Sequence, residues 1–276
     1  MCPEIWAGAL GDFRATSTAS GGTALSTTAV YIQFPALSKA GDSKKCHLFI
    51  TPRNFATAVV AKLAFNPWLT VLKTTDNGVT YTDYSIEAQD NSTDTSVTLS
   101  SLDTEANGDW LLVGSHIPFG GVSLDVDGTN STGSRTLTLA YANAGKAWTD
   151  YALTYSTAWT TAFDAATVIT WTAASDWGAA RFKELFPAYT GNEYFTKIPL
   201  FWTKWTLNGA IDSSVTLDHM LATNMGGAVY GEALPGQCLE EIAKYGFGGF
   251  GNIAAIVNAG TANLIVNVAT LAGSEF

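Results

Sequence analysis

The chain has 276 residues, a formal net charge of −10, and only 14% charged against 47% hydrophobic residues. Its four arginines lack the clustering that binding to a phosphate backbone needs, so we expect no direct nucleic-acid partner. An average soluble domain has about 25% charged residues. With so few charges, the surface of this chain must take its polarity from Thr, Ser, Asn and Gly, or must be partly covered by other protein chains.

The first 45 residues predict an extended N-terminal arm, because stretches such as 16–22 are small, polar and without hydrophobic period. A first β block is expected over 46–108, with strands at 47–51, 58–65, 69–74, 79–86 and 96–102. Segment 58–65 fits a short helix equally well. Asn77-Gly78 predicts a hairpin turn, since both residues tolerate positive φ.

A second block, 109–222, has the period of strands with one dry and one wet face. Val122, Leu124 and Val126 alternate with polar residues, and 137–141 repeats the pattern. Segment 198–207 is apolar on both faces, which predicts a central or interface strand. Residues 178–186 predict about two helical turns ended by Pro187. The chain is therefore expected to be all-β, an antiparallel β-sandwich or jelly roll, with two β blocks related either by duplication or by recurrent hairpin chemistry.

The composition changes near Thr223, so 223–276 is expected to be an apolar C-terminal assembly segment. Residues 237–245 predict a short helix. Residues 253–273 have the length of a bilayer span but are interrupted by three asparagines and a glycine. Leu264, Val266 and Val268 alternate as in a strand, so we expect a segment that is buried or contacts another subunit, and no membrane association.

Residues that carry chemistry are few and scattered. His47, His116 and His219 stand at no metal or triad spacing. Asp125 and Asp127 lie in a turn that lacks the bidentate glutamate of a calcium loop, so a polar turn is the preferred interpretation. The sequence therefore predicts no catalytic residues, no metal, no cofactor and no enzymatic activity.

Trp148 and Trp159 are the candidate glycan contacts, because both lie near turns where an exposed indole can stack on a sugar ring. Core packing is the alternative for both residues. The three cysteines, Cys2, Cys46 and Cys238, are expected to be isolated thiols in a chain made in a reducing compartment.

One short motif resembles the Asp-box of sialidases and related propellers. Thr74, Asp76, Gly78 and Thr80 match it, while Tyr81 departs from its usual last residue. That motif is a structural turn. A sialidase is not expected, because only one copy is seen and four arginines leave little for a carboxylate-binding cluster.

A wider resemblance lies in segments 109–114, 118–122, 136–141, 148–150, 168–172 and 176–177. They resemble a β-sandwich module of tailed-bacteriophage virion proteins, itself similar to carbohydrate-binding jelly rolls, over about 109–221. The resemblance implies a virion structural protein, assembled in the host cytoplasm, that decorates or cements the capsid exterior through arm and tail contacts.

Its expected partners are capsid or other virion proteins, further copies of itself, and a glycan of the host surface. A tail or head-to-tail component is one alternative role. A carbohydrate-binding β-sandwich module is the other, and it is not exclusive of a structural role.

Overall fold

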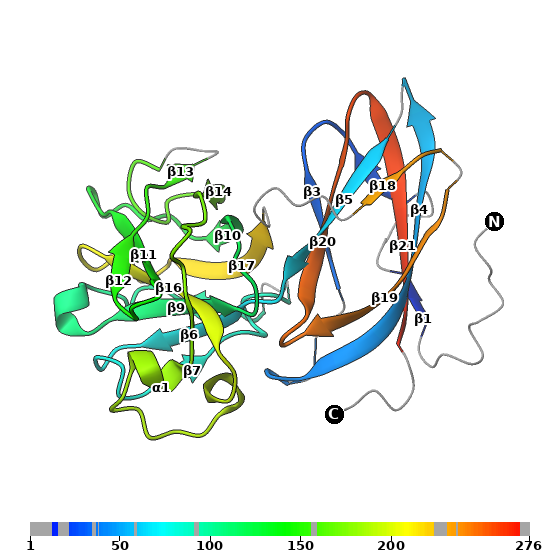
Figure 1. The fold of residues 1–276 in the computed structure, drawn as a ribbon. Helices are drawn as coiled ribbons and strands as arrows, with labels where there is room; N and C mark the ends of the chain where they lie inside the picture. The colour runs from blue at the N-terminus through cyan, green and yellow to red at the C-terminus, as the bar shows by residue number, and fades with distance from the viewer. Residues whose placement is uncertain are drawn as a thin grey trace. The chain divides into compact units, whose positions relative to one another are not determined.

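The computed structural model describes residues 13–15, 22–34, 37, 39–57, 60–90, 94–155, 159–223, 231–235 and 237–270. They divide into two compact units with separate sheets (Figure 1). Unit 1 draws on 1–37, 42–68 and 227–276, and unit 2 on 38–41 and 69–226. Along the sequence, unit 2 is therefore an insertion within unit 1.

Unit 1 is built from strands of both ends of the chain, which are β1 (Phe13–Ala15), β2 (Thr23–Leu25), β3 (Val30–Gln33), β4 (Ser43–Ala56), β5 (Ala61–Pro67), β18 (Gly231–Ala233), β19 (Leu239–Gly246), β20 (Phe250–Val257) and β21 (Thr261–Thr270). One row runs β2, β21, β4, β19, with β1 also on β21. A second row runs β3, β20, β5, β18. All these pairs are antiparallel, and among the described residues the one parallel pair, Tyr245 with Phe250, joins the rows.

The two rows of unit 1 enclose its core. On β21, Leu264, Val266 and Val268 are buried and alternate with half-buried residues, as predicted for a strand. On β20, Ile253 and Ala255 are buried in the same alternating way. In Figure 1 the rows appear as two layers, with β3, β20 and β5 in one and β21, β4 and β19 in the other. The apolar C-terminal region is therefore core of its own unit.

Unit 2 contains two sheets. The five-stranded sheet has the order β13 (Thr154–Tyr155), β14 (Thr167–Thr170), β10 (Gly121–Asp127), β17 (Thr216–Thr223), β8 (Val97–Thr98). The other has the order β12 (Trp148–Asp150), β11 (Leu137–Ala142), β16 (Leu200–Leu207), β9 (Trp110–Ser115), β6 (Thr70–Thr74), β7 (Thr82–Asp83), with β15 (Ala179–Ala180) beside β16. The predicted central strand is thus β16, paired with both β11 and β9.

A single hydrophobic core joins the inner faces of these two sheets. The five-stranded sheet contributes Val122, Leu124 and Ile169, and the seven-stranded sheet contributes Leu139 and Trp205, all nearly inaccessible to solvent. The antiparallel β-sandwich expected over 109–222 is confirmed, and it also uses strands from 69–108.

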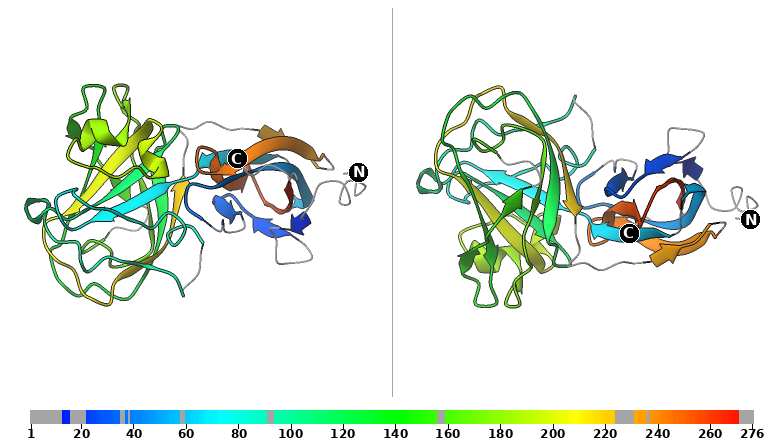
Figure 2. Two further views of the ribbon diagram at one scale, coloured as in Figure 1. Left: turned by 90° about the horizontal axis from the view of Figure 1, so that it is seen from below. Right: turned by 90° about the horizontal axis from the view of Figure 1, so that it is seen from above.

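Several local expectations are corrected. Residues 239–246 form a strand, not a helix, because Leu239–Gly246 pairs along its whole length with β4. Segment 79–86 contains only the two-residue β7, and turns follow it. The helix predicted over 178–186 is the single turn α1 (Phe182–Leu185), at the periphery of unit 2's strands (Figure 2). Within segment 58–65, residues 61–65 belong to a strand, β5, while 58–59 lie outside the described residues.

The block expected over 46–108 is divided between the units, since β4 and β5 pair in unit 1 and β6 to β8 in unit 2. The described parts of the N-terminal arm, β1 to β3, pair with β20 and β21 of the same chain. Among the described residues, no helix has the length and apolar character to cross a membrane.

Candidate functional site

The outer face of unit 2's seven-stranded sheet carries a group of tryptophan side chains. Because Leu139 and Trp205 point into the core, their strand neighbours Ala140 and Lys204, which pair with each other, lie on the opposite face. Trp202 lies on that same face and is fully buried. Its ring packs edge-on against Phe182 of α1, 5.4 Å between centroids, so the segment around α1 covers this part of the face.

The candidate Trp148 lies at the less covered end of this face, in a group that we call the Trp148 cluster: Glu105, Trp110, Trp148, Phe186 and Lys204. The Lys204 ammonium lies 5.2 Å from the Trp148 ring centroid and 5.5 Å from that of Trp110. It also forms an ion pair with Glu105. Phe186 lies 6.2 Å from Trp148, with tilted rings. The Trp148 ring is thus held by a cation and an aromatic neighbour.

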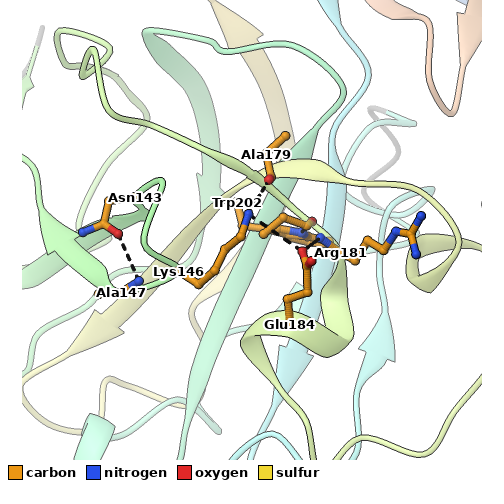
Figure 3. Close-up of polar contacts among 8 residues, drawn as sticks. Asn143, Lys146, Ala147, Ala179, Arg181, Glu184 and Trp202 are labelled. Atoms are coloured by element: carbon orange, nitrogen blue, oxygen red, sulfur yellow. Dashed lines mark hydrogen bonds and ion pairs between the residues drawn. The ribbon is translucent and has the colours of Figure 1, made fainter.

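The hairpin that presents Trp148 is fixed from both sides of its turn (Figure 3). The Asn143 side-chain oxygen accepts a hydrogen bond from the Ala147 amide at 3.1 Å. The Lys146 ammonium donates to the Ala179 carbonyl at 2.7 Å and lies 3.8 Å from the Glu184 carboxylate. These contacts tie the turn between β11 and β12 to the α1 segment, so Trp148 has a defined orientation.

The other candidate, Trp159, packs on the edge of the unit 2 core. Its indole N–H donates to the Ala165 carbonyl at 2.8 Å, and its ring lies 5.0 Å from Phe163 and 5.3 Å from Tyr155. Trp148 and Trp159 belong to separate contact groups, the first on the outer face and the second beside the core. Trp159 therefore packs against the core, whereas Trp148 lies outside the core cluster and is half-buried.

The motif that resembles an Asp-box forms the predicted turn between β6 and β7. Asn77 and Gly78 both have positive φ, 58° and 78°. The Asp76 carboxylate accepts hydrogen bonds from the Thr80 amide at 2.8 Å and from the Thr80 and Thr74 hydroxyls at 2.6 and 2.8 Å. These hydrogen bonds, led by that from the Thr80 hydroxyl, lower the pKa of Asp76.

Replacing Asp76 with alanine should destabilise unit 2 by about 0.5–1.5 kcal/mol, because three donors of the turn exchange this acceptor for water. Urea denaturation of the full chain measures the change. Thr75→Ala is the matched control, since Thr75 is exposed in the same turn. Equal stability of the two variants would show that the network contributes nothing.

No group of three or more His, Cys, Asp or Glu side chains within the described ranges is arranged to hold a metal ion. Asp125 and Asp127 lie on β10 next to Asp218 of β17. The pKa of Asp218 is raised, mainly because the residue is partly buried and also because these two carboxylates repel its negative charge. His219 lies opposite Asp125 in the same strand pair. Burial lowers the pKa of His219, which favours its neutral form.

Unit 2 should lose stability as the pH falls below the ordinary histidine pKa of 6.5. The folded pKa of His219 is lowered, so the unfolded chain takes up the proton first and is favoured by acid. Melting temperatures between about pH 7.5 and 5.5 test this, with His219→Asn as the comparison. The variant should show a shallower fall, and an identical fall in both proteins would contradict the assignment.

The cysteines depart from expectation in one respect. Cys46 is a free, buried thiol, and burial raises its pKa to about 12. Cys238 is disulfide-bonded, so the expectation of three isolated thiols is wrong for this residue.

Sequence reasoning missed Lys204, Glu105 and Phe186 as neighbours of Trp148. They are distant in the chain and meet only because β16, the 3-10 turn Glu105–Asn107 and the α1 segment converge on one sheet face. Lys204 is the one charged residue of the strand Leu200–Leu207, and this is the local signal that it has a special partner. No protein-family model, curated protein sequence or solved structure matches the chain.

Proposed function

We propose that the protein is a structural component of a tailed-bacteriophage virion that decorates or cements the capsid exterior. The observation that carries the proposal is the strand order of unit 1, together with the sequence resemblance described above. The consecutive strands β2/β3, β4/β5, β18/β19 and β20/β21 lie one in each row, so the chain passes from one row to the other at each of these four connections.

This order supports a jelly roll for unit 1, with rows β2-β21-β4-β19 and β3-β20-β5-β18. Jelly rolls are common in viral capsid proteins and also in lectins. Because a fold does not by itself determine function, the choice between these classes rests on the sites. The packing of Trp159 against the core, with its indole N–H bonded to Ala165, favours the structural role over glycan binding at that residue.

Unit 2 enters the jelly roll in the connection between β5 and β18. An insertion at a connection leaves every strand pair of the host sheet intact, so a shell-binding unit can carry a second β-sandwich. Unit 1 would make the contacts with the capsid, and unit 2 would be the displayed module.

In this proposal the C-terminal segment does not reach out as a loose apolar tail to contact neighbouring subunits. Leu264, Val266 and Val268 are buried in the core of unit 1 and are not available to contact another subunit. Association must then use sheet edges and exposed side chains of the folded units. The proposed partners remain capsid or other virion proteins, with a tail or head-to-tail position as the alternative location.

Tryptic mass spectrometry across a density gradient of phage particles from the source culture tests the proposal. The peptides are expected to band with DNA-filled heads at a copy number near that of the shell protein. A few copies per particle would place the chain in the tail or neck. Peptides that stay at the top of the gradient, apart from all particles, would overturn the proposal.

A further inference from the structure

The longest sheet edge in unit 1 is β19. It has eight residues, whereas the other strands at row ends, β1, β2, β3 and β18, have three or four. On one side β19 pairs with β4 throughout, and on the other its one described strand partner is Phe250, opposite Tyr245. Within the described part of the chain, 239–244 thus presents an unpaired row of backbone groups, the arrangement that accepts a further strand.

The outward side chains of this edge are Glu240, Ile242 and Lys244, all exposed. They share one face because side chains alternate along a strand. Ile242 is 63% exposed, the highest value among the exposed large hydrophobic residues of the described chain. An exposed apolar side chain on a long open edge is unusual, since edges are commonly kept short, charged, bulged or covered.

This pattern is complementary to itself. If two copies of β19 pair antiparallel with Ile242 on the two-fold axis, Ile242 meets Ile242 of the second copy. Glu240 then lies opposite Lys244, and Lys244 opposite Glu240, so both charge pairs are attractive. Opposite residues of an antiparallel pair lie on the same face, about 4.5–5.5 Å apart between Cβ atoms, close enough for these contacts.

The neighbouring strand β4 supports the arrangement. His47 is paired in register with Ile242, and its Nε2 lies 2.6 Å from Oε1 of Glu240. That contact holds the Glu240 carboxylate along the outward face while the side chain stays 51% exposed. The acid is thus oriented but still accessible to a cation from another chain.

We propose that β19 is a self-association edge, through which two copies of this chain form a two-fold symmetric dimer by antiparallel pairing of 240–244. The second copy is the favoured occupant because the same strand supplies both halves of the charge pattern. A strand from a different protein would need the complementary sequence. The inference stands on the geometry of β19 and does not rest on the proposed function.

Sedimentation equilibrium of the full chain tests the dimer. Ile242→Lys should weaken association about tenfold or more, because two like charges would face each other on the axis. Val79→Lys is the matched control, since Val79 is 58% exposed but lies in unit 2. It should leave association unchanged.

Charge reversal gives the sharper test. Glu240→Lys alone and Lys244→Glu alone should each weaken self-association about tenfold or more, since each creates two repulsive pairs. An equimolar mixture of the two variants should associate, because every cross-strand pair is then opposite in charge. Circular dichroism checks that both variants remain folded.

Three results would overturn the inference. One is a wild-type chain that stays monomeric at about 100 μM. Another is a dimer that Ile242→Lys leaves intact, which would place the interface elsewhere. The third is two folded charge variants that fail to associate when mixed, which would exclude the antiparallel register.

Discussion

Replacing Trp202 with alanine is expected to destabilise unit 2 by about 3–5 kcal/mol, the usual cost of truncating a fully buried tryptophan. The ring is inaccessible to solvent and packs against Phe182. Its N–H donates to the Ala180 carbonyl at 3.0 Å, and Gly114 lies against it so closely that an added Cβ would approach ring atoms to 2.6 Å. The cavity would therefore be bounded by stiff backbone that cannot collapse into it.

Guanidinium denaturation of the full chain would measure this loss. The transition of unit 2 should shift while that of unit 1 stays in place, because Trp202 belongs to unit 2. Trp202→Phe should cost less, since it keeps most of the buried ring and loses the indole hydrogen bond. A truncation to alanine that costs no more than about 0.5 kcal/mol, the range of surface substitutions, would disprove this packing.

Deleting residues 224–276 is expected to abolish the folding of unit 1 and to leave unit 2 folded. The deletion removes β18 to β21, including β21 between β2 and β4 and β20 between β3 and β5. The remaining strands β1 to β5 would lose their antiparallel partners and half of the core. Every strand of unit 2 lies within 70–223 and keeps its partners.

Limited trypsin digestion with mass spectrometry would show the result as a resistant fragment near 69–223 and rapid loss of 1–68. The fragment 69–226, expressed alone, should give the dispersed amide NMR spectrum of a folded β protein. Complete digestion of the shortened chain would mean that unit 2 depends on unit 1, contrary to the separation of their sheets.

The local strand chemistry was predictable from the sequence. Alternation identified β10, β11 and β21, since period two is a property of the strand itself. Asn77-Gly78 identified its turn, because the required φ values depend on those two residues. The helix predicted over 237–245 was wrong. The side-chain pattern fits a helix, but 239–246 pairs with the free edge of β4 and forms a strand.

The candidate site was predictable only in part. Trp148 was found because an aromatic residue beside a turn is visible in the sequence. Its neighbours Lys204 and Glu105 were not, since they come from positions 99 residues apart that share no local pattern. Which indole is open to a ligand depends on such neighbours, so sequence alone could not separate a binding surface from packing.

The sequence by itself determined the all-β class, the positions of most strands and the scarcity of catalytic chemistry, because these follow from local period, turn residues and composition. Only the tertiary structure decided which strands are partners. It showed that 46–68 and 231–270 belong to one unit, and that most of unit 2 lies between these two ranges along the chain. Backbone hydrogen bonds between strands carry no side-chain identity, so partner choice depends on the packing of the whole core rather than on any single segment.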